Sequence, residues 1–358
     1  MSRDFLIVKT SSIGDVIQSF HLVDYLKKRF PNCKIDWVVE KEIAPLLRAH
    51  PQLDQVLEVD TKTWRKNPFK FQCAMSTFRK KLRKKNYDAL FDLQGNSKSG
   101  CITAFAKARQ KVGYGWQDVC EKPNYFSTNV HLPISHVNVR ERYLQLLQDY
   151  FGDDDPIEMH SLELKLTQEE ETRLERLQQL CFERPRLMIC FGSNWRNKTL
   201  TEETLLAFLH RIDEKFAPSY FFIYGNAEEK KMADRLERSF SRCSHSVGNL
   251  SLPLWQRFMQ VVEGVISMDS AALHLCATTK TPSFSLFGPS SALAYKPVGE
   301  RHYAFQGSCP YEVQFDKRCP HLRTCQTGAC LREASADELY EKFDAFWEKV
   351  SDKQLVPV

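Results

Sequence analysis

The chain has 358 residues, of which 42% are hydrophobic and 27% charged, and its formal net charge is +5. This composition excludes an intrinsically disordered chain, and the length favours two domains over one. No uninterrupted apolar run approaches the roughly 18 residues that a membrane helix needs. The start of the sequence also lacks the basic stretch and apolar segment of a secretion signal. We therefore expect an intracellular, soluble protein.

Residues 4–16, DFLIVKTSSIGDV, change character twice. Phe5 to Val8 are continuously apolar, which is typical of a strand buried on both faces of a parallel sheet. A polar turn with Gly14 follows, and a helical spacing of apolar residues begins at Val16. In an open α/β sheet such a turn lies at the carboxyl edge, where ligands bind. Asp15 is therefore either a helix-capping residue or a functional carboxylate.

The first half of the chain continues as alternating strands and helices. This rhythm predicts a parallel, doubly wound sheet, with residues 115–130 irregular. The expected strands are Lys34–Val39, Val56–Val59, Ala89–Leu93 and Lys111–Tyr114, and the expected helices are Ile43–Ala49, Phe69–Leu82, Ser99–Ala106 and Val139–Phe151.

The positive charge is concentrated in one segment. Between Lys62 and Lys85 there are ten basic residues and no acidic one, so the remainder of the chain is net negative. A concentrated basic face attracts anionic lipid headgroups, nucleic acid or an acidic substrate. The alternative interpretation is a solvated helix face.

A polar break at Gly152–Pro156 and a charged helix at Glu169–Cys181 separate this half from a second βα series. We expect an N-terminal domain over 1–165, a second domain over 166–335, and a C-terminal helix within 336–358. This helix packs either on the second domain or back on the first. The second series predicts strands at Leu187–Phe191, Tyr220–Tyr224, Gly264–Met268 and Ser283–Phe287, and helices at Glu202–Phe216, Glu228–Phe240, Leu252–Val262, Ala271–Thr278 and Ala336–Val350.

One strand end in the second half has the features of an anion site. Asp269 and Ser270 precede a helix that begins with the small residues Ala271 and Ala272. Free backbone N–H groups and the helix dipole favour an anion there, although helix capping alone explains the same residues. His274, one turn on, is a ligand contact or a core histidine.

Two neighbouring strand ends strengthen this interpretation. Ser193 and Asn194 lead to Lys198, and Gly225 leads to Glu229. Together they offer phosphate donors, a neutralising lysine and a carboxylate for a ribose diol, which predicts a nucleotide site. The alternatives are a solvated loop lysine and an ordinary first-turn helix acid. Neither a Gly-x-Gly-x-x-Gly nor a P-loop motif is present, so dinucleotide and P-loop chemistry are disfavoured.

Five stretches together form a recognisable set. They are KTSSIGDV at Lys9–Val16, Trp64–Lys66, Gly115–Gln117, the Lys198 loop and DSAALH at Asp269–His274. With this set the sequence resembles, over nearly its whole length, the ADP-heptose:lipopolysaccharide heptosyltransferases of glycosyltransferase family 9, and within them the heptosyltransferase I branch. The resemblance implies the GT-B architecture of two Rossmann-like domains around a cleft. It also implies an inverting, metal-independent glycosyltransferase of lipopolysaccharide inner-core biosynthesis, with no cofactor.

The resemblance implies roles for the candidate residues. Asp15 would be the general base that deprotonates the acceptor hydroxyl, which suits an oxocarbenium-like transition state. Lys198 would stabilise the departing ADP in place of a metal ion. The implied donor residues are Ser193, Asn194 and Lys198 for the diphosphate, Glu229 for the ribose, Leu250 for the adenine, Asp269 for heptose hydroxyls, Ser270, Ala271 and Ala272 for the phosphates, and His274 beside them.

The implied acceptor is a Kdo sugar on lipid A at the cytoplasmic face of the bacterial inner membrane. The implied acceptor residues are Ser12, Gly14, Lys62, Trp64, Arg65, Lys66 and His136. For His136 a structural role at a helix start is an equal alternative. The segment Lys62–Lys85 would make the enzyme a peripheral membrane protein, with no nucleic-acid partner. The alternatives are a related transferase with another nucleotide sugar or a later inner-core heptose acceptor, and a catalytically silent binding protein.

Twelve cysteines would normally suggest disulfides, but five of them lie in apolar, regular-looking segments rather than in a short, loop-rich scaffold, so we expect most of the cysteines to be reduced core thiols. The predicted core thiols are Cys73, Cys101, Cys181, Cys190 and Cys276. A second group, Cys309, Cys319, Cys325 and Cys330, lies within 22 residues near the C-terminus. Four thiols could bind zinc or iron, but the spacing contains no CxxC pair, and we expect no metal site.

Overall fold

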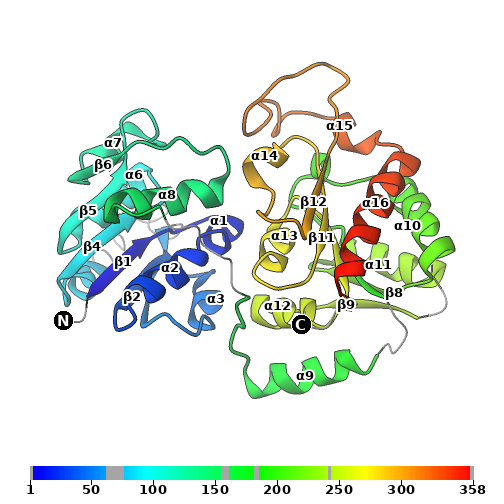
Figure 1. Cartoon of the computed structure of the whole chain (residues 1–358), viewed down its shortest axis with the longest axis horizontal. Helices are drawn as coiled ribbons and strands as arrows, with labels where there is room; N and C mark the ends of the chain where they lie inside the picture. Colours follow the sequence, from blue (N-terminus) through cyan, green and yellow to red (C-terminus); the bar gives the residue numbers. More distant parts are fainter. Residues whose placement is uncertain (1–2, 62–75, 155–160, 181–184, 241–242, 355–358) are drawn as a thin grey trace. The chain divides into compact units, whose positions relative to one another are not determined.

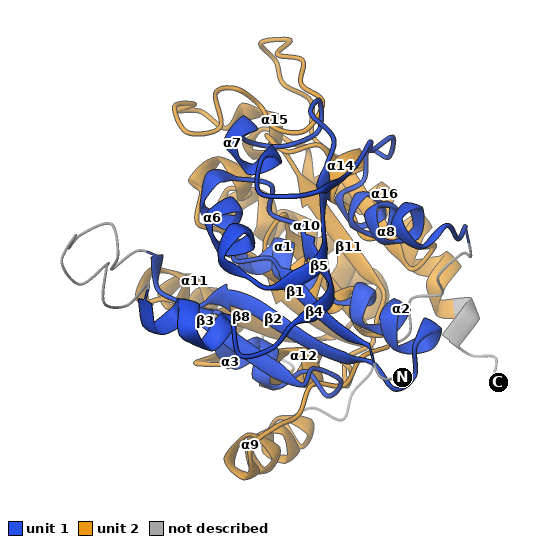
Figure 2. Ribbon diagram, turned by 90° about the vertical axis from the view of Figure 1, so that its left-hand side faces the viewer, with its two compact units in different colours: residues 1–160 blue, residues 161–358 orange. Residues whose placement is uncertain are grey.

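The structure is a computed structural model that describes residues 3–61, 76–154, 161–180, 185–240 and 243–354. The chain divides into two compact units, Met1–His160 and Ser161–Val358 (Figure 2). The division falls five residues before the expected domain limit. In the described part of the chain, no helix combines the length and apolarity that crossing a bilayer requires.

Unit 1 is a six-stranded, all-parallel sheet with flanking helices, in the order β3-β2-β1-β4-β5-β6 (Figure 1). The central strand β1 pairs with β2 on one side and with β4 on the other. Strands β1 to β3 therefore follow one another toward one edge of the sheet, and β4 to β6 toward the other, so the strand order reverses between β1 and β4. Its elements are β1 (Asp4–Val8), α1 (Ile13–Ile17), α2 (His21–Arg29), β2 (Lys34–Glu40), α3 (Ala44–Arg48), β3 (Gln55–Val59), β4 (Tyr87–Asp92), α6 (Ser97–Phe105), β5 (Ala108–Tyr114), α7 (Lys122–Tyr125), β6 (Val130–Leu132) and α8 (Val139–Phe151).

Unit 2 repeats the same layout, with the sheet order β12-β11-β10-β7-β8-β9. The reversal here lies between β7 and β10. Its elements are α9 (Gln168–Gln178), β7 (Arg186–Cys190), the 3₁₀ turn η1 (Arg196–Lys198), α10 (Glu202–Phe216), β8 (Ser219–Tyr224), α11 (Ala227–Ser239), β9 (Ser244–Gly248), α12 (Leu252–Met259), β10 (Gly264–Met268), α13 (Ala271–Cys276), β11 (Ser283–Phe287), α14 (Ala292–Tyr295), β12 (His302–Gln306), α15 (Ala329–Arg332) and α16 (Ala336–Gln354).

The central strands form these sheets because their residues are apolar on both faces. Phe5 to Val8 of β1 are all buried, as are the five residues of β10. Parallel sheets covered by helices on both sides require such runs. The two doubly wound sheets confirm the predicted fold class.

The last helix, α16, belongs to the core of unit 2. Phe343 and Trp347 are buried there together with Phe208 of α10. Phe343 and Phe208 meet edge to face with ring centroids 5.9 Å apart. The apolar face of α16 is therefore buried within unit 2, and the predicted contact of this helix with the first domain stays a prediction.

The cysteines divide by position. Cys190 and Cys276 are buried free thiols, as expected. Cys101 is exposed, because it lies on the solvent side of α6, so its assignment to the core was wrong. Cys243 is disulfide-bonded. Cys73 and Cys181 lie outside the described residues.

A buried histidine makes the stability of unit 1 depend on pH. Burial, reinforced by the nearby Arg140 guanidinium, lowers the pKa of His21 from 6.5 to about 3. Between these values the unfolded chain binds a proton that the folded chain does not, so stability falls as pH falls through this window. From about pH 7.5 to about pH 5, we expect the His21→Gln variant to lose about 2 kcal/mol less stability than the parent in urea denaturation.

The matched control is His210→Gln, which replaces an exposed histidine of α10. It should show the parent's pH dependence. An unchanged pH dependence in the His21→Gln variant would contradict the prediction.

Candidate active site

The turn after β1 holds Asp15 in a capping box at the start of α1. The Ser12 backbone N–H and hydroxyl donate to Asp15 Oδ2 at 3.1 and 2.7 Å. The Ser12 carbonyl accepts the N–H of Val16 at 2.9 Å. Asp15 is therefore a capping residue, at the third helical position, and its half-buried carboxylate has one oxygen in these bonds. Its role as general base stays a prediction.

The neighbouring strand end supports this turn. Gln94 Oε1 accepts the backbone N–H groups of Thr10 and Ser11, both at 3.2 Å. Asp92, fully buried, accepts the N–H groups of Gln94 and Gly95 at 3.1 and 3.0 Å. These bonds join the ends of β1 and β4 at the point where strand order reverses, which is where ligands bind in doubly wound sheets. Sequence reasoning missed Gln94, whose only signal was its place directly after a buried strand.

Most of the predicted acceptor cluster lies outside the described residues, namely Lys62, Trp64, Arg65 and Lys66. Gly14 is in the first turn of α1. His136 is exposed; its Nδ1 lies 3.6 Å from the Glu141 carboxylate, and its carbonyl accepts from Arg142. The acceptor roles of these residues stay predictions.

The described end of the basic segment is helical through residues 76–82. Arg79 and Arg83 are exposed, and the Arg79 guanidinium lies 5.4 Å from the centroid of the Phe105 ring. Lys85 differs, because its Nζ pairs at 2.7 Å with the buried carboxylate of Asp36. Lys85 therefore has a structural partner within unit 1, whereas the arginines remain available at the surface.

In unit 2 the fold brings together two predicted donor residues. Lys198 Nζ lies 2.5 Å from Asp269 Oδ2, with side-chain exposures of 13% and 8%. Lys198 ends the η1 turn that follows β7, and Asp269 directly follows β10. Since β7 and β10 are the strands between which the order reverses, this ion pair lies at the expected ligand position of the sheet.

A cavity of about 580 Å³ opens beside these strand ends. Ser193, Asn194 and Glu229 line it, as does Gly192. Glu229 Oε2 accepts the Gly225 N–H at 2.7 Å. A Cβ at Gly192 would lie 2.5 Å from Glu229 Oε1, so only glycine lets the carboxylate reach this place. Three predicted donor residues from two strand ends thus share one cavity.

Two arginines that sequence reasoning missed also line this cavity. Arg196 comes from η1 and Arg332 from the short helix α15. With them, the cavity lining combines two guanidinium groups with hydroxyl and amide groups and three carboxylates, those of Glu202, Glu228 and Glu229. Guanidinium groups bind phosphate oxygens, so this lining suits a phosphate-bearing sugar nucleotide or a similar ligand. Arg196 could have been found from the sequence, because it lies two residues before Lys198. Arg332 is more than 130 residues from Lys198 in the sequence, and no sequence pattern indicates it.

The remaining predicted donor residues are distributed differently. Ser270 is the N-cap of α13, and the first amides of that helix, at Ala271 and Ala272, follow it. His274 is buried in α13, as the core interpretation expects. Leu250 is half-buried between β9 and α12. Of the predicted donor residues, only Ser193, Asn194 and Glu229 line the cavity. The others, which are Lys198, Leu250, Asp269, Ser270, Ala271, Ala272 and His274, are not among its lining residues.

Comparison with known proteins agrees with this architecture. Residues 75–324 match the family profile described as "Glycosyltransferase family 9 (heptosyltransferase)". Lipopolysaccharide heptosyltransferase 1 of Pseudomonas aeruginosa is 26% identical over 323 residues, covering 89% of this chain and 88% of that protein. Lipooligosaccharide heptosyltransferase 2 of Haemophilus influenzae is 23% identical, covering 83% and 87%.

A solved structure, that of the E. coli heptosyltransferase WaaC with ADP, superposes with a TM-score of 0.75 at 22% identity. The match covers 96% of this chain and 99% of that one. This likeness extends through both doubly wound sheets and confirms the GT-B fold. The family profile covers well over half of the sequence, and the chain belongs to glycosyltransferase family 9, the heptosyltransferase family.

Proposed function

We propose that this enzyme transfers heptose from ADP-heptose to a Kdo residue of the lipopolysaccharide inner core, with inversion and without a metal ion. The observation that carries the proposal is the Lys198–Asp269 ion pair, 2.5 Å long, at the reversal point of the unit 2 sheet. The next residue after Lys198, Thr199, and the residue before Asp269, Met268, line the cavity. The relatives named lipopolysaccharide heptosyltransferase 1 support heptose transfer to lipopolysaccharide, and the solved structures of WaaC with ADP and with an ADP-heptose analogue support the donor.

Within the proposal, Lys198 exchanges Asp269 for the donor diphosphate. Its ammonium then neutralises the charge that develops on ADP as the glycosidic bond breaks. The released Asp269 carboxylate accepts hydrogen bonds from heptose hydroxyls. Ser193, Asn194 and the first amides of α13 hold the phosphates, which suits the dipole of a helix N-terminus.

Asp15 is the proposed general base, which takes the proton of the acceptor hydroxyl as it attacks the anomeric carbon. A carboxylate suits this step because the hydroxyl becomes acidic only as the new bond forms. The exposed arginines of the basic segment are proposed to contact anionic headgroups, which would place the enzyme at the cytoplasmic face of the inner membrane.

The direct test is ADP release from ADP-heptose with Kdo-lipid A as acceptor. We expect turnover that requires both substrates and a product heavier than the acceptor by one heptose residue in mass spectrometry. A protein that binds ADP-heptose but releases no ADP with any inner-core acceptor would contradict the proposal.

A second candidate is transfer to a heptose that is already on the inner core. It is favoured by the relatives named heptosyltransferase 2. A panel that compares Kdo-lipid A with the same acceptor carrying one heptose decides between them through kcat/KM, since acceptor discrimination is expressed in that ratio.

Glu229 allows a test of the donor site alone. We expect Glu229→Ala to weaken ADP binding by roughly tenfold to a hundredfold, because a hydrogen bond to a charged group contributes about 1.5–3 kcal/mol. Isothermal titration with ADP measures this change. Glu203→Ala, which removes an exposed acid from the first turn of α10, is the control and should bind ADP as the parent does. Equal affinity of the two variants would exclude a ribose contact for Glu229.

A further inference from the structure

Lys9, which directly follows β1, is the one buried lysine among the residues that the structure describes, with 4% of its surface exposed. Successive side chains of an extended chain point to opposite faces of the sheet, so Lys9 shares a face with Phe5. Phe5 meets Phe151 of α8 edge to face, with ring centroids 5.9 Å apart. Lys9 Nζ lies 5.0 Å from the centroid of the Tyr143 ring, nearer the start of α8. The Lys9 side chain is therefore enclosed between β1 and α8, at the carboxyl edge of the unit 1 sheet.

Neighbouring groups fix the place of Lys9 without pairing its charge. Trp37 Nε1 donates to the Lys9 carbonyl at 3.1 Å, which holds the backbone. Tyr114 is close by: burial raises the pKa of its hydroxyl, and the positive charge of Lys9 opposes that rise. The same hydroxyl donates to the Leu93 carbonyl at 3.2 Å. The ammonium thus lies among aromatic side chains, which attract a cation through their ring faces.

No hydrogen bond or ion pair joins the Lys9 ammonium to the residues that the structure describes. Three half-buried lysines show the usual arrangement, in which a buried carboxylate lies within bonding distance. They are Lys85 with Asp36 at 2.7 Å, Lys98 with Glu40 at 3.0 Å and Lys198 with Asp269 at 2.5 Å. Lys9 is more buried than any of these lysines, and a buried charge without a partner is costly because it has lost its water.

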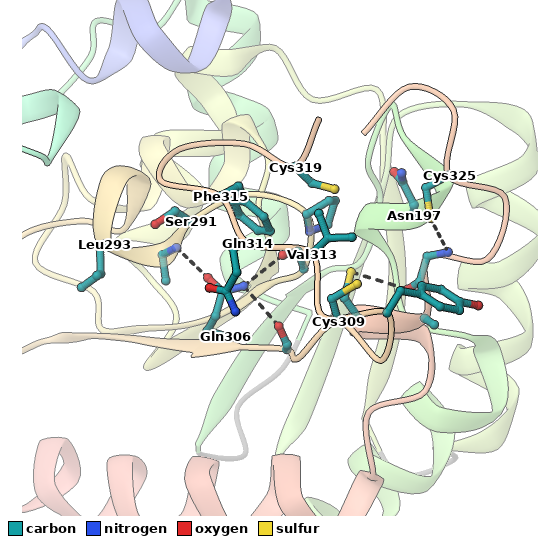
Figure 3. A pocket seen from close by; sticks show the side chains of 18 of the residues that line it. Asn197, Ser291, Leu293, Gln306, Cys309, Val313, Gln314, Phe315, Cys319 and Cys325 are labelled. Atoms are coloured by element: carbon teal, nitrogen blue, oxygen red, sulfur yellow. Dashed lines mark hydrogen bonds between the residues drawn. The ribbon is translucent and has the colours of Figure 1, made fainter. Parts of the chain in front are cut away.

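Polar side chains that line a cavity are also bonded to the chain itself elsewhere in the protein. A second cavity in unit 2, of about 480 Å³, is lined by the four cysteines near the C-terminus and by Gln306. Gln306 Oε1 accepts the Ala292 N–H at 2.8 Å, and its Nε2 donates to the Gly288 carbonyl at 2.9 Å (Figure 3). Lys9 departs from this arrangement, as is expected of a group whose partner is a ligand.

Lys9 is placed where an acceptor ligand is expected. It begins the turn that leads to Asp15, and α1 starts at Ile13 in the same turn. This turn lies between β1 and β4, where the strand order reverses and ligands bind in doubly wound sheets. A ligand whose hydroxyl is bound at Asp15 would therefore have its neighbouring groups close to Lys9.

We propose that the Lys9 ammonium binds the carboxylate of the acceptor sugar and so holds that sugar against Asp15. Kdo is an acidic sugar, and its carboxylate is attached to the same ring as the hydroxyl that receives the heptose. The contact is a charge-assisted hydrogen bond, which supplies the partner that Lys9 lacks within the chain. Lys9 is a binding residue in this scheme, and it exchanges no proton with the substrate. The inference rests on the proposed function, because it names a group of the proposed acceptor.

The first experiment measures acceptor binding and requires no turnover. The full chain and its Lys9→Met variant are titrated calorimetrically with deacylated, soluble Kdo-lipid A and with its carboxyl methyl ester. We expect the ester to bind the parent roughly tenfold to a hundredfold more weakly than the free acid, and Lys9→Met to lose a similar factor for the free acid. For the ester, parent and variant should bind alike, since the two changes remove the same contact. An equal loss for both forms, or none for either, overturns the proposal.

The phosphates of the acceptor are the other anions that a lysine could bind. We expect dephosphorylated Kdo-lipid A to show the same ratio of affinities between parent and Lys9→Met as the phosphorylated form. A ratio that falls to one without the phosphates would assign Lys9 to a phosphate and overturn the carboxylate contact. A parent that binds the free acid more tightly than the ester but releases no ADP would contradict the proposed function and leave this inference standing.

Stability separates a binding role from a structural one. Methionine keeps a long side chain over Tyr143 and removes a buried, unpaired charge, so Lys9→Met should have a urea midpoint at or above that of the parent. The matched control is Lys34→Met, at the exposed start of β2, which should match the parent in midpoint and in acceptor affinity. A lower midpoint of Lys9→Met with unchanged acceptor affinity would assign Lys9 to the fold alone. If Lys9→Met does not fold, equal binding of acid and ester by the parent still overturns the proposal, and Lys9→Gln replaces it in the titrations.

Discussion

Replacing Asp15 by asparagine is expected to lower kcat by roughly 10²–10⁴-fold, the range that general-base catalysis contributes. Asparagine keeps an oxygen that can accept from the Ser12 N–H and hydroxyl, which now donate to the carboxylate at 3.1 and 2.7 Å. The capping box at the start of α1 should therefore survive, and only the ability to take a proton is lost. Steady-state ADP release at saturating donor and acceptor measures the change.

A purely structural role of Asp15, as a helix-capping residue, predicts the opposite result. If the carboxylate only caps α1, Asp15→Asn should retain its rate, and Asp15→Ala should lose about 1 kcal/mol of stability. Asp24→Asn, in the first turn of α2, provides a control for removing one acid from the same unit. ADP binding by Asp15→Asn should match the parent, because the proposed donor residues are all in unit 2. Full activity in this variant would exclude Asp15 as the base.

The strands that were not predicted from the sequence are strands without a continuous run of apolar residues. β6, β9 and β12 are three of the four edge strands of the two sheets, and most of their residues are half-buried. An edge strand needs no continuous apolar run, so a sequence such as SHSVG in β9 cannot be told from a loop by its apolar residues. The central strands that are buried on both faces carry such runs and were predicted within two residues at each end. The exception among the non-edge strands is β5, which begins three residues before the predicted start, in a part of the strand that is exposed or half-buried.

The site was predictable in its position but not in its contacts. Strand ends of a parallel sheet share one edge, which is why Ser193, Glu229 and Asp269 could be grouped from sequence. The ion pair between Lys198 and Asp269 spans 71 residues, and its formation depends on how the η1 turn is held. No local pattern encodes such a contact, because neither residue changes the periodicity of its own segment.

Replacing Lys198 by alanine is expected to lower kcat by roughly 10²–10³-fold, the usual loss when one group that stabilises transition-state charge is removed. The ADP affinity should also fall, since the same ammonium is proposed to bind the diphosphate. The stability should decrease by on the order of 3 kcal/mol, because the nearly buried Asp269 carboxylate loses its partner. Initial rates, calorimetric titration with ADP and urea denaturation measure the three effects.

The loss of rate could arise in two ways, and a double variant separates them. Asp269→Asn removes the carboxylate charge, so adding Lys198→Ala to it no longer leaves a buried anion without a partner. If Lys198 acts on the departing diphosphate, the double variant should remain roughly 10²–10³-fold slower than Asp269→Asn alone. If the lysine only neutralises Asp269, the two should turn over at the same rate. Because stability is restored in the double variant under either mechanism, a slow rate there cannot be ascribed to unfolding and would locate the role of Lys198 in the reaction itself.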